Sequence, residues 1–208
     1  MSTDFELLDR WRAGDSSAGN ALFQRHFDAI YRFFEHKAPG EQDELIQTTF
    51  YACVRARDQF RKQSSFRTYL FTLARHELYR YLRRRRRGGA AVDFTVTSLV
   101  DLGTSPSGRI DRDERRALLV RALCTLPLEQ QLLLELHYWE DMRPAELAEV
   151  FDVAHTTART RLFRARQALR RRIEQLADRP AGDRSGLPDL DDWARALHNR
   201  RLKGDGAG

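Results

Sequence analysis

The chain has little of what marks membrane-spanning or disulfide-bonded proteins. Its 208 residues contain two cysteines, Cys53 and Cys124, which lie far apart within apolar helical patterns. Each is expected to be a small core residue rather than a disulfide partner or a metal ligand. No run of the sequence approaches the roughly 18–20 apolar residues of a membrane span. The first residues carry early acids and no apolar core of the signal-peptide type. We therefore expect a soluble, cytoplasmic protein without direct membrane insertion.

Residue patterns of common enzymes are also missing. The six histidines show no close metal-ligand spacing, and the sequence has neither a P-loop nor a dinucleotide-binding fingerprint. We therefore expect no catalytic residue, no metal site and no cofactor.

Acidic side chains are absent from one long stretch. Residues 155–173 hold seven arginines and no Asp or Glu. An apolar stripe at helical spacing runs through this stretch, formed by Ala158, Leu162, Ala165 and Leu169. A solvated amphipathic helix usually tolerates mixed charge, whereas a helix that docks in a DNA groove needs cationic and hydrogen-bonding side chains on one face. The pattern therefore favours a DNA-binding helix over a merely solvated one.

The preceding residues complete a helix-turn-helix pattern. Residues 145–151 predict a helix that buries Leu147, Ala148, Val150 and Phe151, and residues 152–154 form the corner, with Val153 as an apolar plug. The side chains predicted to lie off the stripe of the second helix are Arg159, Thr160, Phe163, Arg164 and Arg166. This face is the candidate for contact with duplex DNA.

Positive charge is concentrated rather than spread. The net charge is +6, and residues 55–87 hold twelve Lys or Arg against two acids, Asp58 and Glu77. Aromatic residues are interleaved with these cations from Phe60 to Tyr81. Splayed bases of single-stranded nucleic acid stack on aromatic rings while cations follow the phosphates, so this composition favours a single-strand surface. The alternative is that the aromatics belong to the core, which we expect for Phe71 and leave open for Phe66 and Tyr69.

The periodic segments are helical throughout, which predicts an all-α protein of two small domains. Four helices, at 5–13, 18–37, 43–57 and 66–86, can share one core in a first domain of residues 1–87. Residues 88–111 form a flexible linker, with one short extended piece at 94–99. A second helical domain spans 112–178 and contains helices at 112–126 and 128–137 before the helix-turn-helix. The tail, residues 179–208, is expected either to be disordered or to form a marginal helix at 187–202.

One helix carries an acidic and polar face in an otherwise basic chain. This face consists of Asp43, Glu44, Gln47 and Thr48. Acids at a helix N-terminus suit the helix dipole, which is the simpler explanation. The functional alternative is a docking face for a basic protein partner.

Together these pieces resemble the extracytoplasmic-function group of bacterial sigma factors, the short two-domain branch of the sigma-70 family. Four stretches carry the resemblance: DELIQTTF at 43–50, FRKQSSFRTYLFTLAR at 60–75, LPLEQQLLLELHYWEDMRPAELAEVF at 126–151 and TARTRLFRAR at 157–166. The resemblance implies two partners, core RNA polymerase and promoter DNA, with an anti-sigma factor as a further candidate.

The resemblance also implies a role for each surface. The first domain would bind core polymerase through Asp43, Glu44, Gln47 and Thr48. It would hold the melted minus-ten element with a specificity loop, formed by Phe60, Arg61, Lys62, Gln63, Ser64 and Ser65, and with a helix face that carries Arg75, His76, Tyr79 and Arg83. The second domain would read the minus-thirty-five element through His155, Thr156, Arg159, Thr160, Phe163 and Arg164.

The chain departs from the family pattern at a few positions. His76 stands where the family often has Asn, and Arg80 where it often has Asp, which bears on base choice at the minus-ten element. Asp152 and Thr156 stand at a corner that is often Gly-rich. Asp tolerates the left-handed backbone conformation, so we expect the corner to form.

Two other functional interpretations compete with that of a sigma factor. A helix-turn-helix repressor would dimerise on a palindrome and use its first domain as a sensor, but a ligand pocket does not explain that domain's basic, aromatic surface. A helical interaction module without a nucleic-acid role does not explain the acid-free arginines. Co-purification with core polymerase would separate all three.

Overall fold

The computed structural model describes residues 2–35, 37–86, 92–102 and 114–176. The described residues form eight α-helices and no strand, which confirms the predicted all-helical fold. None of the helices among them is long and apolar enough to cross a membrane. The chain divides into two units, one formed by Met1–Ala91 with Glu149–Asp152 and the other by Val92–Ala148 with Val153–Gly208. The tail predicted for 179–208 lies outside the described residues.

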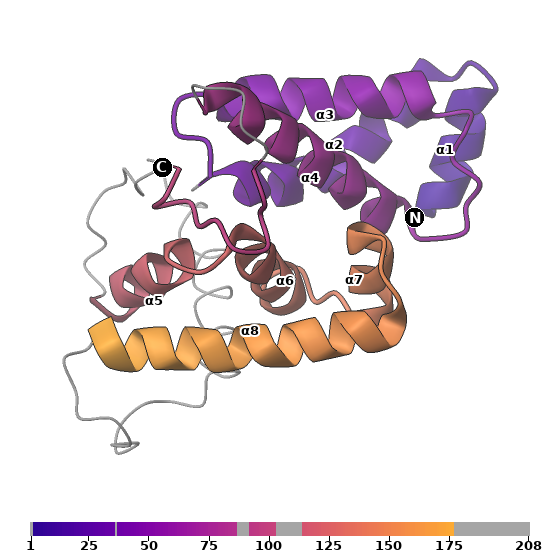
Figure 1. The fold of residues 1–208 in the computed structure, drawn as a ribbon. Helices are drawn as coiled ribbons and strands as arrows, with labels where there is room; N and C mark the ends of the chain where they lie inside the picture. Colours follow the sequence, from indigo (N-terminus) through magenta and orange to yellow (C-terminus); the bar gives the residue numbers. More distant parts are fainter. Residues whose placement is uncertain (1, 36, 87–91, 103–113, 177–208) are drawn as a thin grey trace. The chain divides into compact units, whose positions relative to one another are not determined.

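The first unit contains α1 (Asp4–Arg12), α2 (Ser16–Phe34), α3 (Gln42–Ala56) and α4 (Phe66–Arg85), shown in Figure 1. Helix α2 contacts each of the other three, so it is the central element of this unit. Its core consists of side chains that are almost completely buried, including Leu8, Leu22, Phe34, Phe66, Phe71 and Leu78. Phe71 was expected in this core, and Phe66, which the sequence left open, also belongs to it.

Side-chain caps begin three of these helices. Thr3 and Glu6 form a reciprocal capping box on α1, with the Thr3 amide donating to Glu6 Oε2 at 2.8 Å. Asp15 accepts from the Ala18 amide at the start of α2, and Ser65 accepts from the Thr68 amide at the start of α4. A cap of this kind typically stabilises a helix by about 1 kcal/mol. The caps explain why the predicted helix starts agree with the structure to within two residues.

Helix α2 ends three residues earlier than the sequence predicted. The Lys37 and Ala38 amides donate to the Phe34 carbonyl at 3.0 and 3.2 Å, so the chain turns immediately after Phe34. The Lys37 side chain folds back onto the helix end, where its Nζ donates to the Phe33 carbonyl and lies 4.8 Å from the Phe33 ring centroid. The turn precedes Pro39, whose ring restricts the preceding residue and disfavours continuation of the helix.

The second unit contains α5 (Glu114–Cys124), α6 (Leu128–Tyr138), most of α7 (Pro144–Phe151) and α8 (His155–Leu176). Helices α5 and α6 both pack against α8 (Figure 1). The four residues of the predicted stripe, Ala158, Leu162, Ala165 and Leu169, are all buried, together with Ile173. Cys53 in the first unit and Cys124 in this one are buried, as expected of small core residues.

Part of the expected linker is attached to the second unit. The Leu128 amide donates to the Thr97 carbonyl at 3.0 Å, and the Glu129 amide donates to Phe94 at 3.1 Å. Phe94 and Leu99 are buried. Within the predicted linker, residues 92–102 therefore pack on the start of α6, because these carbonyls cap its orphan amides and two apolar side chains leave water. The predicted extended piece reduces to one isolated bridge, between Ser98 and Pro127.

Candidate nucleic-acid and polymerase interfaces

The outer face of α8 carries the residues predicted for the minus-thirty-five element. His155, Thr156, Arg159, Thr160, Phe163 and Arg164 are all exposed. The Phe163 side chain is 61 % exposed although it is large and apolar, while its neighbour Leu162 is only 4 % exposed. The helix therefore separates anchoring residues from outward-facing residues one position apart along the chain, as docking in a groove requires.

The corner before α8 has the geometry expected from the sequence. Asp152 adopts a φ of 52°, in the left-handed region that Asp tolerates better than most residues. The Val153 amide then donates to the Ala148 carbonyl at 3.0 Å, which satisfies one of the last carbonyls of α7. A residue other than Gly thus forms this turn.

Two of the seven arginines in 155–173 hold α8 onto α6. Arg161 Nη1 lies 2.9 Å from Glu129 Oε2, and Arg166 donates to His137 Nε2 at 2.7 Å. Because Arg166 must donate, His137 accepts through Nε2, and its Nδ1 donates to the Met142 carbonyl at 2.8 Å. The Arg166 guanidinium also lies 5.4 Å from the Tyr138 ring centroid. Arg166, predicted to face outward, is therefore half-buried and structural, because α6 offers it an acceptor and an aromatic face.

The 60–65 loop, predicted to hold the minus-ten element, presents only some of its side chains. Arg61, Gln63 and Ser65 are exposed, whereas Lys62 and Ser64 are half-buried. Phe60 is 8 % exposed, and its ring is stacked on Tyr69 with the centroids 4.4 Å apart. The loop thus turns its aromatic residue inward and its polar residues outward.

Helix α4 carries cations beside an aromatic ring, but of its four predicted minus-ten residues His76 and Arg83 are exposed, whereas Arg75 and Tyr79 are buried. The Arg75 and Arg83 guanidinium groups lie 5.3 and 6.0 Å from the Tyr79 ring centroid, which is the spacing of cation–π contacts. Arg75 Nη2 lies 3.2 Å from His76 Nε2. Partial burial, followed by the positive charges of Arg75 and Arg80, lowers the pKa of His76 below its ordinary value. Arg75, His76, Tyr79 and Arg83 therefore form one cluster in which the imidazole is neutral near pH 7.

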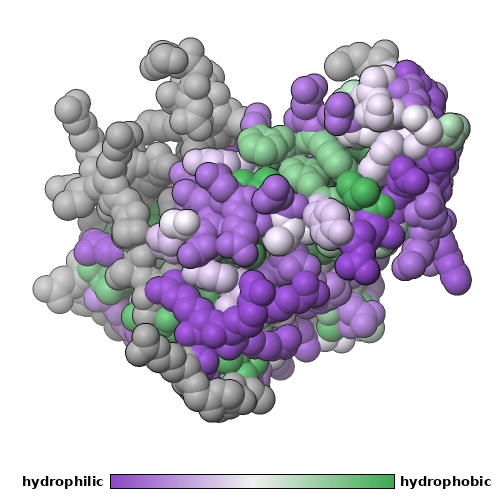
Figure 2. Space-filling view, turned by 90° about the horizontal axis from the view of Figure 1, so that it is seen from above, coloured by the Kyte–Doolittle hydropathy of each residue, from purple (hydrophilic) through white to green (hydrophobic). Residues whose placement is uncertain are grey.

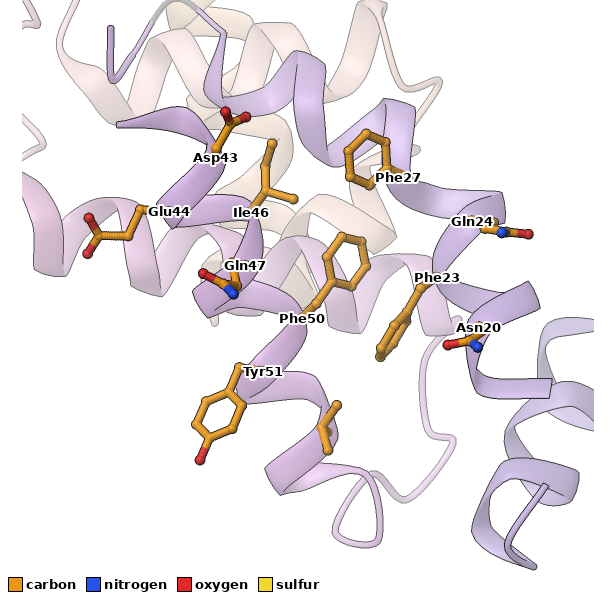
Figure 3. Close-up of a pocket in the computed structure, with 11 residues that line it drawn as sticks. Asn20, Phe23, Gln24, Phe27, Asp43, Glu44, Ile46, Gln47, Phe50 and Tyr51 are labelled. Carbon is orange, nitrogen blue, oxygen red and sulfur yellow. The ribbon is translucent and has the colours of Figure 1, made fainter. Parts of the chain in front are cut away.

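The acidic face of α3 borders an open groove of about 840 Å³ between α2 and α3. Asp43, Glu44 and Gln47 lie along one rim of this groove, and Asn20 and Gln24 lie along the other (Figure 3). Thr48, predicted to share the face, does not line the groove, and its hydroxyl donates to the Glu44 and Leu45 carbonyls of its own helix.

The floor of the groove is apolar, which the sequence did not predict. It consists of Phe23, Phe27, Ile46, Phe50 and Val54, with Tyr51 at one end. Phe27 and Val54 fall at the helical spacing of a buried face, yet they are 45 % and 41 % exposed, and Tyr51 is 62 % exposed. Figure 2 shows an apolar patch over these helices among hydrophilic side chains. Contiguous exposed apolar area of this kind marks an interaction site.

Comparison with known proteins identifies both units. Residues 22–88 match the model of sigma-70 region 2, and residues 116–169 match the model of sigma-70 region 4. The ECF RNA polymerase sigma-E factors of Salmonella typhimurium and Escherichia coli are each 27 % identical to this chain over 186 residues, which cover 85 % of this chain and 97 % of theirs.

Solved structures share the fold. CnrH, in a complex with the cytosolic domain of CnrY, superposes with a TM-score of 0.62 at 22 % identity and covers 84 % of this chain and 99 % of its own. The sigma factor RpoE of Bartonella quintana, in a complex with the anti-sigma factor NepR, gives a TM-score of 0.55 at 20 % identity, over 76 % of this chain and 95 % of its own. With both sigma-70 regions present in order, the chain belongs to the sigma-70 family of RNA polymerase sigma factors, in its extracytoplasmic-function group.

Proposed function

We propose that this sigma factor uses three surfaces, two of which bind promoter DNA and one of which binds core RNA polymerase. The outer face of α8 reads the minus-thirty-five element, the 60–65 loop with the α4 cluster holds the melted minus-ten strand, and the groove between α2 and α3 binds core RNA polymerase. The chain itself catalyses no reaction, since the polymerase forms the phosphodiester bonds of the RNA. It acts in the cytoplasm, where core polymerase and promoters are.

The single observation that carries this proposal is the division of residues on α8. Phe163 is 61 % exposed beside a buried Leu162, and the exposed residues Arg159 and Arg164 lie in a segment without any acid. A large apolar ring held in water between two cations supports contact with a partner that is both charged and apolar. Duplex DNA offers phosphates, base acceptors and thymine methyl groups in its major groove.

The minus-ten assignment is supported by chemistry on two elements of one unit. The exposed Arg61 and Gln63 supply a cation and an amide that can pair with an unstacked base. On α4, His76 and Arg83 are exposed, and the Arg75 and Arg83 guanidinium groups lie against the buried Tyr79 ring. Exposed cations of this kind follow the phosphates of a single strand.

The polymerase assignment is supported by the composition of the α2–α3 groove. An apolar floor with an acidic rim fits an amphipathic helix that presents apolar side chains inward and Lys or Arg outward. The acids of α3 thus have a role beyond that of the helix dipole. We extend the same logic to an anti-sigma factor, the class of partner bound by the Bartonella neighbour, as a regulator that competes for the surfaces of this chain.

The test is reconstitution with core polymerase, followed by transcription from a promoter library randomised at both elements. The wild-type chain is expected to select sequence at both elements only as holoenzyme. Binding by the free chain should be weak and strongly dependent on salt, because phosphate contacts dominate it. Sequence-specific binding to a palindrome by the free chain would instead support the repressor.

The groove is tested separately by charge reversal. Replacing Asp43→Lys together with Glu44→Lys should weaken core binding by about 1–3 kcal/mol, which is the range for charge-assisted contacts. Asp28→Lys is the matched control, since Asp28 is an exposed acid of α2 outside the groove lining. Equal core affinity for the double variant and the control would remove the groove from the interface.

A further inference from the structure

Helix α1 holds the 60–65 loop from outside through one arginine. The Arg12 guanidinium donates through Nε to the Arg57 carbonyl at 3.1 Å and through Nη2 to the Phe60 carbonyl at 2.6 Å. One rigid fork therefore bridges the end of α3 and the first residue of the loop. Both acceptors are backbone carbonyls, so the contact fixes the path of the main chain whatever the side chains do.

A second contact from α1 holds the middle of the loop. Lys62 Nζ lies 2.6 and 2.7 Å from the two carboxylate oxygens of Asp9. The same ammonium lies 5.5 Å from the Phe5 ring centroid, and the Phe5 and Phe60 rings are 6.5 Å apart. Lys62 has a φ of 56°, in the left-handed region that a Lys seldom occupies. Such a backbone conformation persists only where surrounding contacts stabilise it. The turn directs the Lys62 ammonium toward Asp9, whose carboxylate accepts from it.

Helix α1 is itself fixed to the rest of the first unit. The Trp11 ring meets the Phe23 ring edge-on at 5.1 Å, and the Arg57 guanidinium lies 5.2 Å from the Trp11 ring. The approach to α2 is so close that a Cβ added at Gly19 would lie 2.7 Å from Trp11. At the other end of α1, Asp4 pairs with Arg25 at 2.6 Å and His26 at 2.7 Å. A helix held at both ends can serve as a rigid support.

We propose that α1 is the positioning element of the minus-ten loop, with Arg12 and Asp9 as positioning residues that set its base selectivity without touching DNA. The proposal rests on the function assigned above to the 60–65 loop. Helix α1 lies before residue 22, where the match to sigma-70 region 2 begins. A loop that is already ordered loses less conformational freedom on binding, and it presents Arg61 and Gln63 in one geometry rather than several.

The two positioning residues are expected to act differently. Arg12→Ala frees two carbonyls and lets the loop explore other paths, so the matched base loses its advantage over mismatched bases. Asp9→Asn removes the carboxylate charge beside Lys62 and also leaves the ammonium available to phosphates. That variant should bind single strands of any sequence more tightly at low salt, with a steeper salt dependence, while its discrimination falls.

The experiment compares holoenzymes made with wild-type chain, Arg12→Ala, Arg12→Lys, Asp9→Asn, Asp9→Glu and the control Arg10→Ala. Arg10 lies on the same helix but pairs with Asp15, away from the loop. The readout is the ratio of affinities for a single-stranded minus-ten oligonucleotide and its scrambled version, beside selectivity at the upstream element in the promoter library. We expect Arg12→Ala to lower the ratio about tenfold or more and Asp9→Asn to lower it less. Asp9→Glu should restore most of it, while the upstream selectivity and the Arg10→Ala ratio stay at the wild-type values.

The outcomes separate this proposal from the one on which it rests. If the wild-type ratio is near one, or if Arg61→Ala and Gln63→Ala leave it unchanged, the function assigned to the loop is wrong. If the wild-type ratio is high and the α1 variants keep it, α1 does not position the loop. Should Arg12→Ala fail to fold by circular dichroism, Arg12→Lys decides, because Lys keeps the charge but cannot reproduce the fork. An equal loss at both promoter elements would indicate global damage and would also reject the proposal.

Discussion

Helix α8 and the 60–65 loop are both assigned to DNA, yet they are held in place by different means. On α8 the anchoring residues are apolar and alternate with the outward residues along one helix. In the loop, Phe60, Lys62 and Ser65 are themselves the anchors, through a ring stack, an ion pair and a helix cap. The outward residues of the loop, Arg61 and Gln63, alternate with its anchors within six residues. We therefore expect recognition and support to be coupled in the loop and separable on α8. Substitutions can test this difference directly.

The largest effect is expected when the α8 anchor is broken. Leu162→Ala removes a side chain that is 4 % exposed and should destabilise the second unit by about 2–5 kcal/mol. Phe163→Ala, one residue later, should change stability by less than about 0.5 kcal/mol, because its ring is already in water, yet it should weaken minus-thirty-five binding. Hydrogen exchange of α6 and α8 measures the first effect, and holoenzyme binding measures the second. Similar destabilisation by both variants would contradict the separation on α8.

The next test compares two arginines of α8. Arg159→Ala should cost about 1–3 kcal/mol at the upstream element and relax preference at one base pair, without a change in stability. Arg166→Ala should do the reverse, because Arg166 is engaged with His137 and Tyr138. Promoter-library transcription and urea unfolding of each variant would show the two patterns. A uniform loss across all promoters for Arg159→Ala would make Arg159 a phosphate contact.

The same contrast explains what the sequence could predict. The stripe of α8 and the helix caps are local patterns, so the helices and the outward face of α8 followed from periodicity. The loop depends on Asp9 and Arg12, which lie about fifty residues earlier, and no local pattern pairs them with Lys62 and Phe60. The groove was missed for a related reason. Phe27 and Val54 fit the period of a buried face, but periodicity does not say whether another helix covers it.

A smaller effect on stability and binding is expected from removing the hydroxyl of Ser65 in the loop or of Thr160 on α8. Ser65→Ala removes the cap of α4 and should cost about 1 kcal/mol of stability, together with some minus-ten selectivity, because the cap also ends the loop. Thr160→Ala is the matched change on α8, where the hydroxyl donates only to the Thr156 carbonyl of its own helix. Such a back-bond contributes little to helix stability, so only upstream binding should change. Thermal unfolding and the two affinity ratios together test the coupling. A Ser65→Ala chain with lower stability but unchanged minus-ten selectivity would show that support and recognition are separable in the loop too.

The smallest effect concerns acid, which should weaken the cap of α2 in the loop-bearing unit but not the apolar stripe of α8. Asp15 caps α2, and hydrogen bonds from Ser17, Arg10 and the Ala18 amide lower its pKa from 3.8 to about 2. Because the folded state holds this carboxyl deprotonated, its contribution to stability is complete above pH 3.8 and is lost as the pH falls toward 2. The stripe that anchors α8 is apolar and has no proton to gain. Hydrogen exchange of α1 and α2, measured between pH 5 and pH 2.5, should therefore show a larger loss of protection in the wild-type chain than in the Asp15→Asn variant. The Asn side chain keeps a helix cap that does not titrate. Equal acid sensitivity in the two chains would remove Asp15 from the supports of this unit.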